Sequence, residues 1–292
     1  MKSWVKAARL HQWLKNLLLF MPLLAAHQER DLNRIWHLIA GFFAFSLLAS
    51  SVYLINDLID IESDRKHPRK KYRPFASGAL STNSGWRMAP ALMLLGLGLG
   101  SAIGRNFFFW LVVYFSITLA YSLFLKRLVI VDGITLATLY FLRIVAGASA
   151  SKTSLSFYLA TFSIFLFLSL AFVKRYAELR LASKMDSDSD FGRGYLVEDA
   201  PIVQVLGVAS GYAAVVILAL YLNTDYVHKL YAHPQFVWGL VPVLLYWISW
   251  VWLKAHRGEM NDDPLLFAVR NRESQVAGLI FLAILIAGSV GR

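Results

Sequence analysis

Residues 56–73 read NDLIDIESDRKHPRKKYR, and they follow directly on a long apolar segment. Asp60 and Asp64 come three and seven residues after Asp57, so the three carboxylates project from one side of a helix. Such oxygen ligands suit Mg²⁺, which takes one or two carboxylates together with substrate phosphate oxygens. Six Lys or Arg residues follow in the same stretch and suit the phosphates themselves. The stretch therefore predicts a metal–diphosphate site at a membrane surface.

The composition around this stretch is that of a membrane protein. The chain has 292 residues, of which 58% are hydrophobic and only 16% are charged, and its mean hydropathy is +0.54. A soluble domain of this size would carry more charge. Apolar runs of membrane-spanning length recur throughout, so we expect an all-α integral membrane protein with one catalytic domain over residues 1–292. The nine predicted spans are residues 14–27, 33–55, 86–104, 107–124, 130–150, 155–174, 200–222, 235–253 and 275–291.

The net charge of +11 is distributed unevenly between the two sides of these spans. Of the 29 Lys and Arg residues, 22 lie at the N-terminus and in the loops after the second, fourth, sixth and eighth spans. Six lie on the other side, and Arg143 lies within a span. We therefore expect a multi-pass protein of the cell (inner) membrane. By the positive-inside rule, its N-terminus and the loops 56–85 and 175–199 lie on the cytoplasmic side. This distribution argues against nucleic acid as a partner.

The absence of cysteine excludes disulfides and Cys-based metal or redox chemistry. The first 26 residues resemble a signal peptide, but Lys15 and Asn16 interrupt the approach to the apolar run and further spans follow. We therefore expect a retained helix.

Polar residues in the later spans are further candidates. Asp132 and Arg143 are eleven residues apart, about three helical turns, so both face the same way. An arginine at this depth should face a polar cavity or a partner, and a structural ion pair or hydrogen bond would satisfy it equally. Lys174 and Glu178 are four residues apart and can pair on one helix face. Lys174 and Arg175 also suit simple anchoring at the cytoplasmic end of a span.

The loop 175–199 leaves two interpretations open. Asp186 and Asp190 satisfy an Asp-x-x-x-Asp pattern that could hold a second metal, but alternating Ser and Asp is also typical of a flexible polar loop. Arg193 and Tyr195 could close over a substrate or belong to an ordinary turn.

Residues 56–64 have the pattern Asn-Asp-x-x-Asp-x-x-x-Asp, and Arg73-Pro74 and Gly78 follow. This combination resembles the first signature of the UbiA superfamily of intramembrane prenyltransferases, and the span 130–150 fits that family as well. The resemblance covers essentially the whole chain. It implies a bundle of nine transmembrane helices around a central cavity, with Mg²⁺ holding a diphosphate substrate. The metal ligands it implies are Asp57, Asp60 and Asp64, and we expect Asn56 to be a further ligand beside them.

Two further strings, residues 9–16 and 174–179, resemble the decaprenyl-phosphate phosphoribosyltransferases within that family. This resemblance implies transfer of 5-phosphoribose from 5-phosphoribosyl 1-diphosphate to a polyprenyl phosphate. The alternative is a prenyltransferase that moves a prenyl chain from its diphosphate to an aromatic or other acceptor. A transporter or lipid-binding protein is disfavoured because the charge concentrates at one face.

The resulting expectations assign a role to each candidate residue. Asp57, Asp60 and Asp64 are the expected catalytic residues. The expected substrate-binding residues are Lys15, Asn16, Asn56, Arg65, Lys70, Arg73, Tyr121, Lys126, Asp132, Arg143, Lys174, Arg175, Glu178, Arg193 and Tyr195. Small residues in the spans allow close helix packing within one chain or between copies, so a homo-oligomer is compatible with the sequence.

Overall fold

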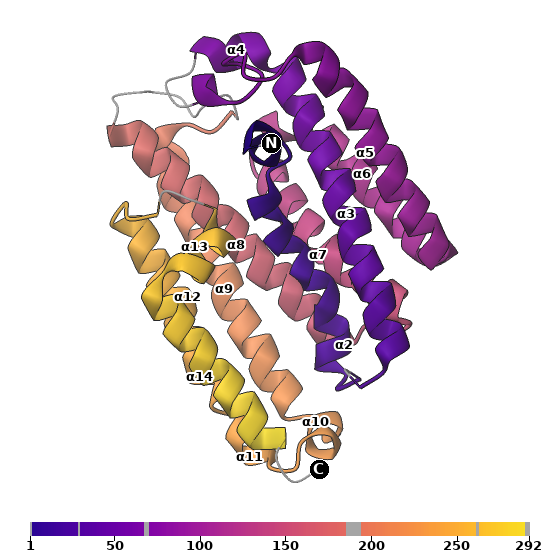
Figure 1. The fold of residues 1–292 in the computed structure, drawn as a ribbon. Helices are drawn as coiled ribbons and strands as arrows, with labels where there is room; N and C mark the ends of the chain where they lie inside the picture. The colour runs from indigo at the N-terminus through magenta and orange to yellow at the C-terminus, as the bar shows by residue number, and fades with distance from the viewer. Residues whose placement is uncertain (1, 29, 67–69, 185–193, 261–262, 290–292) are drawn as a thin grey trace. The chain divides into compact units, whose positions relative to one another are not determined.

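Every element of the described chain is a helix, which confirms the predicted fold class (Figure 1). The computed structural model describes residues 2–28, 30–66, 70–184, 194–260 and 263–289. The helices are α1 (Lys2–Ala7), η1 (Leu10–Phe20), α2 (Met21–Ala25), α3 (Leu32–Ile59), α4 (Ile61–Lys66), η2 (Lys70–Tyr72), α5 (Thr82–Ile103), α6 (Arg105–Leu123), η3 (Leu125–Arg127), α7 (Val131–Ser151), α8 (Phe157–Lys184), η4 (Val197–Asp199), α9 (Ala200–Leu222), α10 (Asp225–Leu230), α11 (Pro234–Val237), α12 (Leu240–His256), α13 (Pro264–Arg270) and α14 (Arg272–Ser289).

Eight helices in the described ranges are long and apolar enough to cross a membrane. They are Leu32–Ile59, Thr82–Ile103, Arg105–Leu123, Val131–Ser151, Phe157–Ser183, Val197–Leu222, Pro234–His256 and Arg272–Ser289. The predicted count of nine is not confirmed, because residues 14–27 lie in η1 and α2 and in the turn after them. The 11 residues of η1 extend about 22 Å and the 5 residues of α2 about 8 Å.

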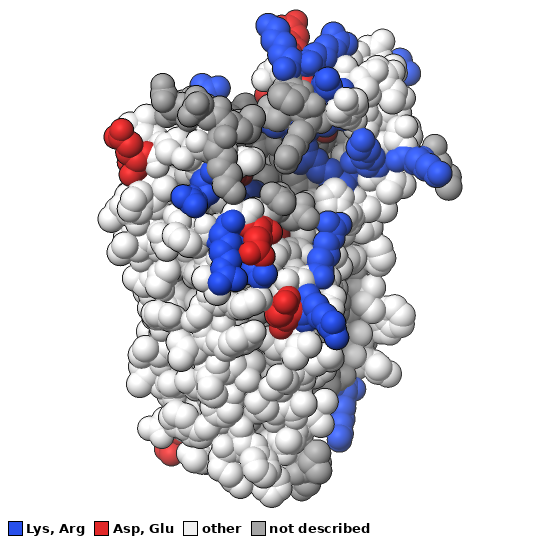
Figure 2. All heavy atoms as spheres, turned by 90° about the vertical axis from the view of Figure 1, so that its left-hand side faces the viewer, with Lys and Arg blue, Asp and Glu red and all other residues white. Residues whose placement is uncertain are grey.

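The surface is that of a multi-pass membrane protein. α5, α6 and α14 are apolar yet mostly exposed, so their outer faces suit lipid rather than water. In the view of Figure 2, broad areas carry no charged side chain and the charged residues occur in groups. This agrees with the sequence expectation of an integral membrane protein.

The chain forms two compact units. Unit 1 comprises Met1–Leu123 and Leu142–Leu155, and unit 2 comprises Phe124–Phe141 and Ser156–Arg292. α7 therefore contributes its first half to unit 2 and its second half to unit 1. A single catalytic domain over residues 1–292 stays a prediction.

In unit 1, α3 and α5 lie side by side, and η1 packs on α3 (Figure 1). η1 also approaches the second half of α7 very closely. A Cβ atom on Gly147 would lie 2.0 Å from the carbonyl oxygen of Leu19, so only glycine fits there. At the other end of α3, Leu58 packs in a buried cluster with Phe75, which fixes the segment that follows the acidic motif.

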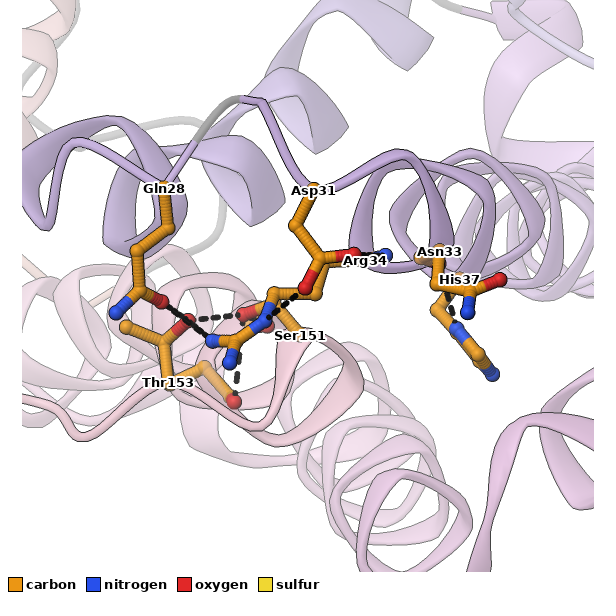
Figure 3. Close-up of polar contacts among 9 residues, drawn as sticks. Gln28, Asp31, Asn33, Arg34, His37, Ser151 and Thr153 are labelled. Carbon is orange, nitrogen blue, oxygen red and sulfur yellow. Dashed lines mark hydrogen bonds and ion pairs between the residues drawn. The ribbon is translucent and has the colours of Figure 1, made fainter.

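The N-terminal end of α3 is held by a polar cluster (Figure 3). Asp31 caps the helix by accepting from the backbone N–H of Arg34, and this hydrogen bond lowers the pKa of the Asp31 carboxyl. The Arg34 guanidinium donates to Gln28 and, at 3.4 Å, to Thr153, which also accepts from Ser151. The cluster ties the turn before α3 to the end of α7. The acidic motif lies at the opposite end of α3, a helix of 28 residues and about 42 Å.

In unit 2, α8 and α9 lie side by side, and α12 packs against both (Figure 1). The indole of Trp252 on α12 donates to the hydroxyl of Ser169 on α8 at 3.1 Å. α14 packs on α11, α12 and α13.

Candidate functional site

The acidic motif lies where α3 ends and α4 begins. Asp60 is the C-cap of α3, and its N–H donates to the carbonyl of Asn56 at 2.9 Å. The N–H of Asp64 donates in turn to the carbonyl of Asp60 at 2.8 Å. The helical path therefore continues almost without a break from one helix into the next. This continuity keeps Asp57 and Asp64, seven residues apart, on one side of the chain.

Asp57 and Asp64 are joined by one arginine. Both side chains are 2% exposed, and Nη1 of Arg73 lies 3.2 Å from Oδ1 of Asp57 and 2.7 Å from Oδ2 of Asp64. Arg9, the residue before η1, places its Nη2 2.6 Å from the same Oδ1 of Asp57. The Arg9 guanidinium also lies 4.7 Å from the ring centre of Tyr53. Two buried carboxylates thus face two guanidinium groups, so their charges balance.

This pair of carboxylates fits a divalent metal. Because both contact the same nitrogen of Arg73, the two oxygens are at most about 6 Å apart. A Mg²⁺ ion shared by two carboxylate oxygens needs them within about 4.2 Å, a separation that lies inside this bound. The donors are hard oxygens, the type that Mg²⁺ prefers.

Asp60 and Asn56 are not brought into the same contact. The Asp60 side chain forms no hydrogen bond or ion pair with any described residue. Asn56 donates through its amide nitrogen to Ser122 at 2.9 Å, whereas a metal would need its oxygen. Within the described ranges no group of three or more His, Asp or Glu lies close enough to hold a metal. The roles predicted for these two residues as ligands therefore stay predictions.

Other residues predicted to bind substrate have different surroundings. Arg65 donates through Nε to the carbonyl of Ala76 at 3.2 Å and not to the acids. Lys70 lies in η2 and Lys126 in η3, both half-buried, and Tyr121 is half-buried near the end of α6. None of these placements tests a role in substrate binding.

Arg143 finds buried partners within unit 1, as its position in a span requires. Its Nε donates to Oδ1 of Asn16 at 2.9 Å, and Nη2 donates to the hydroxyl of Tyr114 at 2.8 Å. Asn16 in turn donates to Ser46 at 2.9 Å, whereas Lys15, one residue earlier on η1, is half-buried. These contacts favour the structural interpretation of Arg143.

Unit 2 contains a second polar cluster, centred on Asp132. Its carboxylate is fully buried and lies 2.5 Å from Nε of Arg175, as an ion pair without the alignment of a hydrogen bond. Arg175 also pairs with Glu178, three residues further along α8. Tyr195 donates to Asp132 at 2.7 Å and accepts from the backbone N–H of Ile130 at 2.8 Å. The segment at Tyr195 is therefore anchored to the start of α7.

The backbone at this anchor has little freedom. Gly194 has φ +83°, and a Cβ there would lie 2.6 Å from the carbonyl oxygen of Arg127. Burial, reinforced by the hydrogen bond to Asp132, raises the pKa of the Tyr195 phenol. The hydroxyl therefore stays protonated at neutral pH and can act as a donor.

The two neighbouring cations of α8 differ in exposure. Arg175 is 1% exposed and is balanced by two acids, so its surroundings suit a positioning role better than the predicted contact with phosphate. Lys174 is 31% exposed and lies 3.8 Å from Oδ2 of Asp263. Glu178 forms an ion pair with Arg175. Its pairing with Lys174, which the sequence spacing allows, stays a prediction.

Sequence reasoning missed three residues of these clusters. Arg9 was noted in the string 9–16 but not as a partner of the motif, and Tyr114 and Asp263 carried no signal. Residues 185–193, with Arg193, Asp186 and Asp190, lie outside the described residues.

Residues 17–285 match the UbiA prenyltransferase family. The chain belongs to this family. It is similar to a UbiA homolog from Archaeoglobus fulgidus solved with DMAPP and Mg²⁺, with a TM-score of 0.70 at 18% identity, covering 98% of this chain and 97% of the other. This likeness shows the UbiA fold.

Three curated relatives are similar in sequence. The uncharacterized protein y4nM of Sinorhizobium fredii is 37% identical over 96% of this chain. This chain spans only 54% of the length of y4nM. Nodulation protein NoeC of Azorhizobium caulinodans is 36% identical, covering 99% of this chain and 96% of that protein. Decaprenyl-phosphate phosphoribosyltransferase of Mycobacterium tuberculosis is 36% identical over 62% of this chain and 61% of its own.

Proposed function

We propose that this UbiA family protein transfers 5-phosphoribose from 5-phosphoribosyl 1-diphosphate to a polyprenyl phosphate of decaprenyl type and releases diphosphate. The reaction would need Mg²⁺ and would take place at the cytoplasmic face of the cell membrane. The observation that carries the proposal is the buried pair Asp57 and Asp64, held beside the guanidinium groups of Arg9 and Arg73. Acids and cations in such contact suit a metal-bound diphosphate.

Each group of this site has a role in the proposal. Asp57 and Asp64 would hold Mg²⁺, which supplies a Lewis acid that neutralises charge on the departing diphosphate. Arg9 and Arg73, which lie beside these acids, would bind phosphate oxygens with charge-assisted hydrogen bonds. The acceptor phosphate is already an anion, so the chain needs no strong general base. Its contribution is mostly positioning and electrostatic stabilisation.

Two facts support a sugar donor over a prenyl donor. One of the relatives is named for the phosphoribosyl reaction and matches this chain at 36% identity. The reaction also gathers three phosphorylated groups, a diphosphate, a 5-phosphate and a lipid phosphate, and therefore needs more cations than prenyl transfer does. The half-buried Lys15, in the same unit as the acidic motif, is a further cation that can serve these groups.

The alternative is transfer of a prenyl chain from its diphosphate to an aromatic or other acceptor. The A. fulgidus homolog, which shares the fold, is bound to DMAPP, and this observation favours the alternative. The alternative needs metal ligands after α8, where the sequence offers Asp186 and Asp190. The double change of both residues to alanine should abolish prenyl transfer, whereas phosphoribosyl transfer should survive it.

Ligand-dependent thermal stability of the purified chain separates the two reactions. We expect 5-phosphoribosyl 1-diphosphate to raise the melting temperature only when Mg²⁺ is present. Asp64→Asn should lose this effect, and Glu62→Gln, an exposed acid of the same motif, should keep it as the matched control. Stabilisation by a prenyl diphosphate alone, with no response to the sugar diphosphate, would contradict the proposal.

A further inference from the structure

We infer that Arg73 occupies the cation position of the acidic motif in the metal-free protein, and that a divalent metal has to displace it from Asp57 and Asp64. The inference rests on the proposed function, because it concerns the metal site on which that function depends. It adds a built-in competition between the Arg73 guanidinium and the metal. It also adds a consequence, that metal binding releases Arg73 to bind phosphate.

The first step is the geometry of the bridge. One nitrogen of Arg73 contacts both carboxylates, at 3.2 Å and 2.7 Å, so it lies where an ion shared by Asp57 and Asp64 would lie. A metal shared by the same two oxygens would have to take the place that this nitrogen fills. Arg73 and the metal therefore exclude one another at this position.

The second step is exposure. The two carboxylates are 2% exposed, whereas Arg73 is 27% exposed and so lies on the solvent side of the acids. The backbone at Arg73 is fixed, since its N–H donates to Lys70 and its carbonyl accepts from Ser77. The exchange therefore needs only rotation of the Arg73 side chain toward solvent.

The third step is charge. Asp57 keeps Arg9 when Arg73 leaves, but Asp64 has no other side-chain partner among the described residues. A buried carboxylate without a counter-charge is strongly unfavourable, so Arg73 leaves only as a cation replaces it. With two acids, two arginines and one divalent ion, the cluster then carries a net charge of about +2. That charge is opposite in sign to that of a diphosphate, which the released guanidinium can bind.

The experiment titrates Mn²⁺ into the purified chain in lipid nanodiscs and follows free Mn²⁺ by electron paramagnetic resonance. Arg73→Gln removes the competing cation, so we expect it to bind Mn²⁺ about 10-fold more tightly than the unchanged chain. Arg65→Gln is the matched control, because it removes one charge from the same loop without touching the acids. We expect it to change the Mn²⁺ affinity by less than about 3-fold.

A second readout uses inorganic diphosphate in the presence of Mn²⁺. Arg73→Gln should bind it about 10-fold more weakly, because the released guanidinium is missing. A purely structural Arg73 would weaken both affinities, so tighter metal binding with weaker diphosphate binding is specific to the inference. Should Arg73→Gln fail to fold, Arg73→Lys tests the same point. The more strongly hydrated ammonium is easier to displace, and about 3-fold tighter Mn²⁺ binding is expected.

The outcomes separate the inference from the proposed function. If the unchanged chain binds no divalent metal, the proposed metal site itself fails. If the unchanged chain binds Mn²⁺, the comparison with Arg65→Gln decides. Should Arg73→Gln bind Mn²⁺ no more tightly than Arg65→Gln, the displacement is wrong and the metal site stands. The same holds for Arg73→Lys if Arg73→Gln does not fold.

Discussion

Tyr195→Phe removes a single hydroxyl from the buried cluster of unit 2. That hydroxyl donates to Asp132 at 2.7 Å and accepts from the N–H of Ile130 at 2.8 Å. A hydrogen bond to a charged group contributes about 1.5–3 kcal/mol, and a buried N–H left without its acceptor costs about 1–3 kcal/mol. Because the two losses share one cluster and are not additive, we expect a destabilisation of about 2–4 kcal/mol.

Thermal unfolding in detergent measures this loss. For a chain of this size about 1 kcal/mol corresponds to roughly 2 °C, so the melting temperature should fall by about 4–8 °C. Tyr72→Phe is the matched control, because that side chain is exposed, and it should change stability by less than about 0.5 kcal/mol. Equal stability of the two variants would refute the hydrogen bond to Asp132.

The pH dependence of the Tyr195 effect has a definite sign. The folded pKa of Tyr195 is raised by burial and by its hydrogen bond to Asp132, whereas the unfolded pKa is about 10. Its contribution is therefore fully present below about pH 10 and is lost as the pH rises through the folded pKa. The difference between the unchanged chain and Tyr195→Phe should stay constant from pH 6 to 9, at about the 2–4 kcal/mol given above. A difference that changes within this range would contradict the assignment.

Three further predictions follow from the packing, the polar cluster of Figure 3 and the metal. Gly147→Ala places a Cβ 2.0 Å from the carbonyl of Leu19 and should cost at least about 2 kcal/mol in thermal unfolding, whereas Gly98→Ala, with open space around it, should cost nothing. Arg34→Ala should cost less than about 1 kcal/mol, and less at high salt, because its ion pair with Asp31 is largely exposed; a larger, salt-independent loss would contradict this. Removing divalent ions with EDTA should abolish activity, and Mg²⁺ should restore it; activity that survives chelation would refute the metal requirement.

The sequence predicted the helical membrane fold and the approach of Asp57 to Asp64 because both depend on local spacing. Apolar runs of about 20 residues specify spans by length alone. The interval of seven residues between Asp57 and Asp64 gives a shared face in any helix, and the structure brings both carboxylates to one arginine. Arg73 was predicted only as one of several cations, since nothing local indicates which of them folds back onto the acids.

The long-range pairs could not be predicted, because tertiary packing and not periodicity selects them. Asp132 and Arg143 are eleven residues apart on one helix, yet each has its own buried partners. The partner of Asp132 is Arg175, which the sequence placed beside phosphate. The 3₁₀ segment η1 was likewise missed, because its apolar pattern is that of an ordinary span.

The measurement that tests the central claim most directly supplies membranes containing this chain with labelled 5-phosphoribosyl 1-diphosphate, Mg²⁺ and a polyprenyl phosphate. The account predicts a chloroform-soluble labelled product that disappears in Asp57→Ala. It would be contradicted if intact protein gave no labelled lipid with acceptors of several chain lengths.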